Sequence, residues 1–136
     1  MSDKIFIDTN ILIYLYSKTE LGKRDKIIKS LENKTLVIST QVLNELSNIL
    51  IKKFYFSVGN ILAVFEELSE LCLISIIRVS TIKKALIIHE QYKYSYYDSL
   101  IISSALDKYC NILYSEDMHN SQTIENSLTI LNPFKF

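Results

Sequence analysis

Four acidic side chains occupy positions that an ordinary hydrophobic core would leave to apolar residues. Two follow apolar runs typical of buried strands and two interrupt the apolar faces of expected helices; they are Asp8, Glu45, Asp98 and Asp117. Carboxylates are rarely buried without a partner. If the fold gathers these four, repulsion and lost hydration would raise their pKa values, and a bound cation would relieve both effects. The pattern therefore predicts a metal site.

The type of ligand indicates the metal and the reaction. Carboxylate oxygens suit hard cations, so we expect Mg²⁺ or Mn²⁺. Because Mg²⁺ keeps several waters, it can take a phosphate oxygen beside an attacking water, and phosphodiester hydrolysis is the natural chemistry of such a site. A zinc site is disfavoured, since the chain has only 2 His and 2 Cys. We expect Cys72 and Cys110, both in apolar stretches, to be reduced core residues.

Helical spacing places Glu45 and Asp98 on core-facing sides. Glu45 lies between Val42 and Leu46 on an apolar stripe, and Asp98 precedes Ile101 at the same helical spacing. Two other roles stay open at this point. Asp98 could complement the dipole at its helix start, an effect of about 0.3–1 kcal/mol, and Glu45 could pair with a lysine. The conjunction of four such acids favours the metal site.

Strands and helices alternate along the whole chain. We expect strands at residues 4–7, 35–38, 72–77, 112–115 and 128–131, and helices at 11–16, 21–32, 41–53, 57–71, from 80 or 81 to 92, and 96–109. This alternation is typical of an α/β sandwich with a mainly parallel sheet. Ligands bind outside the carboxyl ends of the strands in such sheets. Asp8 and Asp117 both follow expected strands, so they can share that edge.

The composition fits a single domain spanning residues 1–136, with 49% hydrophobic residues and a net charge of +0. This balance gives no global support for nucleic-acid binding, although Lys23, Arg24, Lys26 and Lys29 form a local basic cluster. The start of the chain lacks the pattern of a secretory signal, and no apolar run approaches the roughly 18 residues needed to span a bilayer. We therefore expect a cytoplasmic protein without membrane association.

Several short motifs, in order along nearly the whole chain, carry a family resemblance. They are Phe-Ile-Asp-Thr-Asn-Ile-Leu at 6–12, Ser-Thr-Gln-Val-Leu-Asn-Glu-Leu at 39–46, Tyr-Asp-Ser-Leu-Ile at 97–101, Leu-Tyr-Ser-Glu-Asp-Met at 113–118 and Asn-Pro-Phe at 132–134. With these motifs the chain resembles PIN-domain ribonucleases of the kind that serve as VapC-like toxins in type II toxin–antitoxin pairs. Each motif alone is weak, but their order and spacing are fairly specific.

The resemblance implies a three-layer α/β/α fold with a mainly parallel sheet of about five strands. It implies that Asp8, Glu45, Asp98 and Asp117 hold Mg²⁺ or Mn²⁺, with Asp8 and Asp98 at its centre. Thr9, Asn10 and Ser115 match the polar positions that orient those carboxylates. Glu116 neighbours Asp117 and is an alternative fourth acid.

The resemblance also implies an RNA substrate, a cognate antitoxin protein and a homodimer. Water as the nucleophile predicts products with a 5′-phosphate. Two alternatives keep the same fold: a stand-alone RNA-processing PIN nuclease, and a non-catalytic metal-binding interaction module. A phosphotransfer domain related to haloacid dehalogenases is disfavoured, because it needs a second Asp two residues after the first, where this chain has Asn10.

Overall fold

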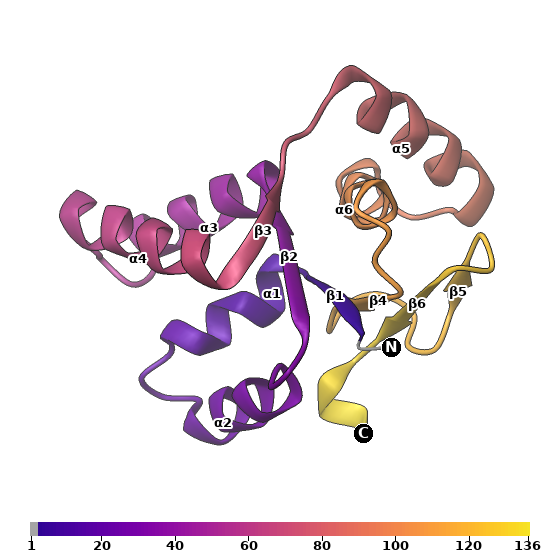
Figure 1. The fold of residues 1–136 in the computed structure, drawn as a ribbon. Helices are drawn as coiled ribbons and strands as arrows, with labels where there is room; N and C mark the ends of the chain where they lie inside the picture. The colour runs from indigo at the N-terminus through magenta and orange to yellow at the C-terminus, as the bar shows by residue number, and fades with distance from the viewer. Residues whose placement is uncertain (1–2) are drawn as a thin grey trace.

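The structure is a computed structural model, and it describes residues 3–136. Its centre is a single sheet with the strand order β3-β2-β1-β4-β6-β5. The strands are β1 (Lys4–Ile7), β2 (Thr35–Ser39), β3 (Cys72–Ser75), β4 (Ile112–Tyr114), β5 (Thr123–Ile124) and β6 (Leu128–Leu131). All neighbouring pairs are parallel except β5 with β6. The expected mainly parallel α/β architecture is therefore confirmed, with one short strand more than expected (Figure 1).

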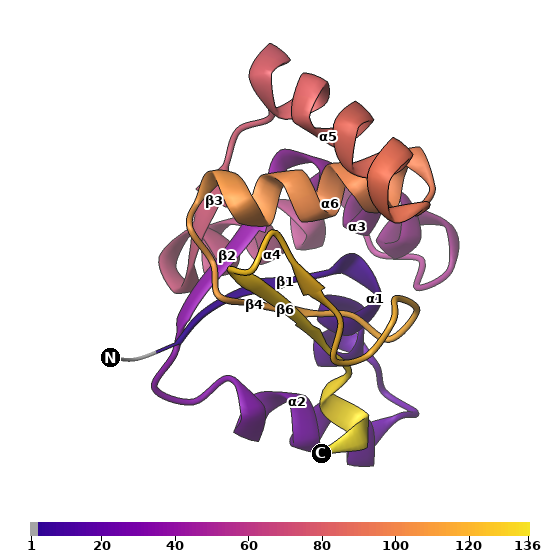
Figure 2. The ribbon, with the colours of Figure 1, turned by 90° about the vertical axis from the view of Figure 1, so that its right-hand side faces the viewer.

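Helices cover both faces of this sheet (Figures 1 and 2). The α-helices are α1 (Thr9–Leu12), α2 (Leu21–Ser30), α3 (Thr40–Lys52), α4 (Val58–Leu71), α5 (Val79–Tyr92) and α6 (Tyr96–Asp107), and the 3₁₀ turns are η1 (Ile13–Tyr16) and η2 (Pro133–Lys135). Helices α5 and α6 lie on one face, and α1, α2 and α4 lie on the other. None of the helices in residues 3–136 is long and apolar enough to cross a membrane.

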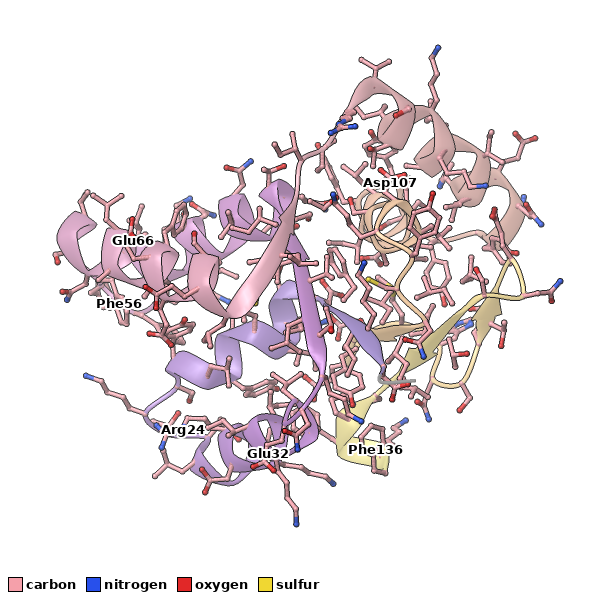
Figure 3. All side chains as sticks on the ribbon, in the orientation of Figure 1. Arg24, Glu32, Phe56, Glu66, Asp107 and Phe136 are labelled. Carbon is pink, nitrogen blue, oxygen red and sulfur yellow. The ribbon has the colours of Figure 1, made fainter. Side chains whose placement is uncertain are left out.

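The core lies on both sides of β1. Ile5, Phe6 and Ile7 are all buried, as is typical of a central parallel strand that has helices on each face. Side chains fill the space between the sheet and the helices (Figure 3). Cys72 and Cys110 are free thiols buried within this core.

Three local differences from the sequence prediction have simple causes. The first helix begins at Thr9 rather than residue 11, because Asp8 caps it by accepting a hydrogen bond from the Thr9 backbone N–H. Helix α5 begins at Val79, since the Thr81 hydroxyl accepts from the Arg78 N–H and so acts inside the first turn instead of before it. Strand β5 was not expected, because it has only two residues and its hairpin turn carries no glycine.

The strand order creates a crevice at one end of the sheet. From β1 the chain adds β2 and then β3 on one side, and it later returns to place β4 on the other side of β1. Neighbouring strands whose following segments diverge in this way leave an opening outside their carboxyl ends, which is the usual ligand position in α/β sheets. Asp8 follows β1 and the segment Ser115–Asp117 follows β4, so the topology brings both to this opening.

Candidate functional site

The opening is a cavity of about 350 Å³ that all four predicted acids line. The other lining residues are Thr9, Asn10, Ile13, Asn48 and Ile49. Among the described residues that line it there is no Lys, Arg or His, so the cavity faces four carboxylates with no opposing basic group. The structure thus brings together side chains from the position after β1, from α3 and α6, and from the segment after β4.

Asp8 is the most deeply placed of the four, with 7% of its surface exposed. Its Oδ1 accepts a hydrogen bond of 2.7 Å from the Thr9 N–H, and its Oδ2 accepts one of 2.9 Å from the Ser115 hydroxyl. The Asp8 N–H donates to the Tyr114 carbonyl at 3.0 Å. These contacts fix the carboxylate between β1 and β4. Each oxygen retains further lone-pair sites, since a carboxylate offers about four in total.

Glu45 and Asp98 reach the cavity from two helices that are tied together at their starts. The Gln41 side chain, in the first turn of α3, donates a hydrogen bond of 3.1 Å to the Tyr97 carbonyl in α6. Glu45 is half-buried, and its Oε1 accepts a 2.7 Å hydrogen bond from the Thr9 hydroxyl. Asp98 is also half-buried, one turn into the helix that the Ser95 side chain caps. Both acids therefore lie on the inward helix faces that their spacing predicted.

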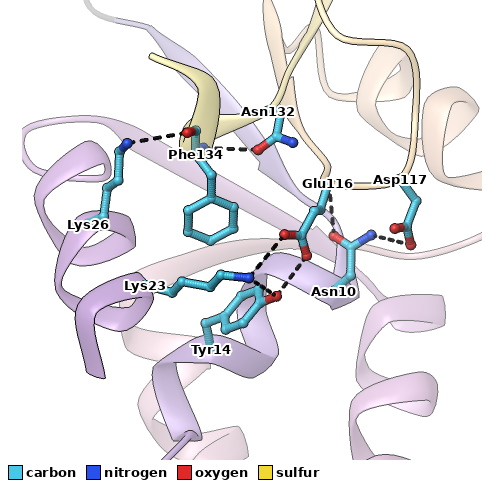
Figure 4. A network of polar contacts seen from close by, with 8 residues as sticks. All are labelled: Asn10, Tyr14, Lys23, Lys26, Glu116, Asp117, Asn132 and Phe134. Atoms are coloured by element: carbon cyan, nitrogen blue, oxygen red, sulfur yellow. Dashed lines mark hydrogen bonds and ion pairs between the residues drawn. The ribbon is translucent and has the colours of Figure 1, made fainter. Parts of the chain in front are cut away.

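Asp117 and Glu116 are neighbours in sequence but point in different directions. Asp117 is exposed at the cavity rim, where its Oδ2 accepts a 2.9 Å hydrogen bond from the Asn10 amide. Glu116 does not line the cavity, and its carboxylate instead accepts a 2.7 Å hydrogen bond from the Tyr14 hydroxyl (Figure 4). Of the two acids that the sequence left open for the fourth position, Asp117 is the one that faces the cavity.

Gathering these acids has an electrostatic consequence. The pKa of Asp8 is raised from 3.8 to about 7. Burial is the main cause, the bonds from Ser115 and Thr9 oppose it, and the nearby carboxylates of Asp98 and Glu45 add to it. Burial also raises the pKa of Asp98, with a further contribution from Asp117 and an opposing hydrogen bond from Ser95. Without a cation, Asp8 therefore keeps its proton up to about pH 7.

The same groups fit a hard divalent cation. The donors are carboxylate oxygens, as Mg²⁺ and Mn²⁺ prefer, and a cation would offset the repulsion that raises the Asp8 pKa. Within residues 3–136, however, no three His, Cys, Asp or Glu side chains already stand in a cluster that could hold an ion. Two of the acids are engaged by neighbouring side chains, since Glu45 accepts a hydrogen bond from Thr9 and Asp117 accepts one from Asn10.

Sequence reasoning did not single out Asn48, which lines the cavity on α3. It follows Glu45 by three residues and so shares its helix face, a spacing that could have identified it. Nor did it link Glu116 to Tyr14 and Lys23. No sequence signal connects these residues, because their contact depends on how α2 packs beside η1.

Comparisons with known proteins agree with this architecture. A family model described as PIN domain matches residues 5–123. Among solved structures, a toxin–antitoxin complex from Klebsiella pneumoniae has a TM-score of 0.72 at 21% identity, covering 95% of this chain and 97% of that one. VapBC2 from Rickettsia felis, bound to a promoter DNA fragment, has a TM-score of 0.68 at 20% identity, with coverages of 95% and 98%.

A third similar structure is VapC20 of Mycobacterium tuberculosis, described as a sarcin-ricin loop cleaving toxin. It has a TM-score of 0.65 at 19% identity and covers 83% of this chain and 89% of that one. At these identities the three structures show a shared fold. No curated protein sequence matches the chain.

Proposed function

The chain belongs to the PIN-domain family, and from this premise we propose that it is a metal-dependent endoribonuclease that serves as the toxin of a toxin–antitoxin pair. The observation that carries the proposal is the convergence of four carboxylates on one cavity that no basic side chain lines among the described residues. Such a cavity repels an RNA phosphate unless a cation is present, so metal binding and phosphodiester chemistry are coupled in it.

In this proposal Asp8 and Asp98 hold a Mg²⁺ or Mn²⁺ ion, and Glu45 and Asp117 complete the site directly or through water. When bound, the cation would polarise a phosphoryl oxygen and stabilise the leaving oxygen. Ser115 and the Thr9 N–H hold the Asp8 carboxylate in one orientation, and the Thr9 hydroxyl does so for Glu45. Preset carboxylates need little reorganisation in the reaction, which is the general benefit of such supporting hydrogen bonds.

The family and its structural neighbours support part of the proposal about partners. Two similar structures contain a toxin with its antitoxin, which supports a cognate antitoxin protein for this chain. An arginine of that partner would suit the carboxylate cavity. The proposal also includes a homodimer, a single PIN-like domain over residues 1–136, and a cytoplasmic location, where thiols such as Cys72 and Cys110 stay reduced.

The test of the reaction uses purified protein and a short single-stranded RNA, with Mn²⁺ or Mg²⁺ added after chelation. We expect products with 5′-phosphate ends, identified by mass spectrometry, because water attacks without help from the 2′-hydroxyl. Asp98→Asn should lower the cleavage rate by about 100-fold or more, since several kcal/mol of charge stabilisation depend on the cation. Asp25→Asn, at an exposed site with 74% side-chain exposure, is the matched control and should cleave normally.

Two outcomes would contradict the proposal. One is a 2′,3′-cyclic phosphate product, and the other is unchanged cleavage by a variant that carries both Asp8→Asn and Asp98→Asn. Expression in cells separates toxin from stand-alone processing nuclease. Growth arrest by the wild type, absent in the Asp98→Asn variant, supports the toxin; normal growth together with metal-dependent cleavage in vitro supports the processing enzyme. Metal binding without any cleavage supports the non-catalytic module.

A further inference from the structure

Glu116 is held by a network on the side of its loop that faces away from the cavity. Its Oε1 accepts the 2.7 Å hydrogen bond from Tyr14, and its Oε2 lies 3.5 Å from the Lys23 Nζ. The Lys23 ammonium also donates to the Tyr14 hydroxyl at 3.3 Å, so the three polar groups close a triangle (Figure 4). An acid already engaged by a cation and a hydroxyl is poorly placed to serve as a ligand in the cavity.

The network extends to the C-terminal turn η2. The Lys23 Nζ lies 5.0 Å from the centre of the Tyr14 ring and 5.2 Å from that of Phe134, within the range of cation–π attraction. The two rings meet edge to face at 5.2 Å. On the same side, the Lys26 Nζ donates to the Phe134 carbonyl at 3.4 Å. The Glu116 loop is thereby connected to η1, α2 and the end of the chain.

Asn10 links this network to the acid that faces the cavity. Its Oδ1 accepts a hydrogen bond of 3.4 Å from the Glu116 N–H, while its Nδ2 donates to the Asp117 Oδ2 at 2.9 Å. Asp117 is exposed, so burial of its own side chain does not fix its position. Two contacts fix its position instead. The Glu116 side chain anchors the adjacent backbone, and the Asn10 amide holds the Asp117 carboxylate.

From this geometry we propose that Glu116 is a positioning residue that acts through Asp117, and that Tyr14, Lys23 and Phe134 form the anchor to which it binds. This inference rests on the proposed metal-dependent function. Removing the anchor leaves Asp8, Glu45 and Asp98 in place but loosens the backbone that presents Asp117. Metal binding and turnover then weaken, whereas RNA binding by the rest of the surface does not.

The decisive experiment is a double-mutant cycle between Glu116→Ala and Asp117→Asn. Glu116→Ala should weaken Mn²⁺ binding, measured by calorimetry without RNA, and lower kcat, each by about 10-fold or more as is common for partners of metal ligands. KM should stay unchanged. In a protein that already carries Asp117→Asn, the Glu116 substitution should lower neither Mn²⁺ affinity nor kcat further, because Glu116 acts on the metal only through the Asp117 carboxylate. Additive losses would overturn the proposal.

Conservative variants separate anchoring from direct ligation. Glu116→Gln keeps an oxygen for the Tyr14 hydroxyl and loses the charge facing Lys23, so it should recover much of the lost Mn²⁺ affinity. Equal loss in Glu116→Gln and Glu116→Ala would contradict anchoring through the Tyr14 hydroxyl. Glu125→Ala breaks a comparable surface ion pair, with Lys84, and is the matched control that should alter neither measurement.

A metal-free measurement keeps this test independent of nuclease activity. Hydrogen exchange at residues 115–118 should be faster in Glu116→Ala than in the wild type, while exchange in β1 and α6 stays the same. Unchanged exchange in this segment would contradict the anchoring role even if RNA cleavage were lost. If the wild type bound no Mn²⁺ and cleaved no RNA, the proposed function would fail, and the exchange result would still report whether Glu116 holds the loop.

Discussion

Replacing Asp8 with Asn should make the metal-free protein more stable while it abolishes activity. The pKa of Asp8 is raised from 3.8 to about 7, chiefly by burial. Between these pH values the folded protein keeps a proton on Asp8 that the unfolded chain has released, so the free energy of unfolding falls as the pH rises. At 1.36 kcal/mol per pKa unit, the loss reaches about 4 kcal/mol above pH 7. Asn has no carboxyl group to ionise, so the variant does not lose this free energy of unfolding as the pH rises.

Asn also fits the hydrogen bonds that hold Asp8. Its side-chain oxygen can accept from the Thr9 N–H, as the Asp8 Oδ1 does. The Ser115 hydroxyl, which donates to the Asp8 Oδ2, can rotate and accept from the new amide, because a hydroxyl is both donor and acceptor. No buried polar atom of the site is therefore left without a partner by the substitution.

The assay is denaturant unfolding followed by circular dichroism between pH 4.5 and 8.5 in the presence of a chelator. We expect Asp8→Asn to exceed the wild type by up to about 4 kcal/mol at pH 8 and the difference to vanish toward pH 4. Asp25→Asn, an exposed control, should stay within about 0.5 kcal/mol throughout. Added Mn²⁺ should stabilise the wild type and not Asp8→Asn. If the variant were no more stable than the wild type at pH 8, or if the difference did not change with pH, the Asp8 carboxyl would not have a raised pKa in the folded protein.

Three further substitutions test the supporting residues. Thr9→Val removes the 2.7 Å donor to Glu45; we expect Mn²⁺ affinity and cleavage to fall by about 10–100-fold, measured by calorimetry and RNA hydrolysis. Ser115→Ala removes a bond that lowers the pKa of Asp8, so the stability loss with rising pH should extend to higher pH in unfolding titrations. Leu46→Ala opens a cavity at a fully buried position and should cost about 2–5 kcal/mol of stability, while Mn²⁺ affinity per folded molecule stays unchanged.

The general placement of the acids follows from sequence, since parallel strands end at one edge and helical spacing selects one face. Asp8 and Asp117 meet for the first reason, and Glu45 and Asp98 point inward for the second. The choice between Asp117 and Glu116 could not be made in this way. The two have the same chemistry and adjacent positions, and only the tertiary contacts with Tyr14 and Lys23 turn one of them away from the cavity.

The extra strand β5 shows a different limit of sequence reasoning. Its hairpin turn has positive φ at Glu125 and Asn126, which are 50° and 59°. In a sequence, Asn-Gly or Asp-Gly usually indicates a turn of this kind, because glycine adopts positive φ without strain. Here Asn126 is in the second position and a glutamate takes the first, so the usual signal is missing. The short pairing of Thr123 and Ile124 with β6 becomes visible only in the folded sheet.

The central position of β1 has a consequence for protein synthesis. Its neighbours are β2, which follows soon after it along the chain, and β4, which belongs to the last third. A nascent chain that has released β1 and β2 therefore still lacks Ser115, Asp117 and the C-terminal turn. At roughly 5–20 residues per second, the ribosome needs several seconds to synthesise the residues between β2 and Asp117. Cleaving activity should thus appear only after Asp117 has been synthesised, and chains terminated before this residue should be unable to attack the RNA around them.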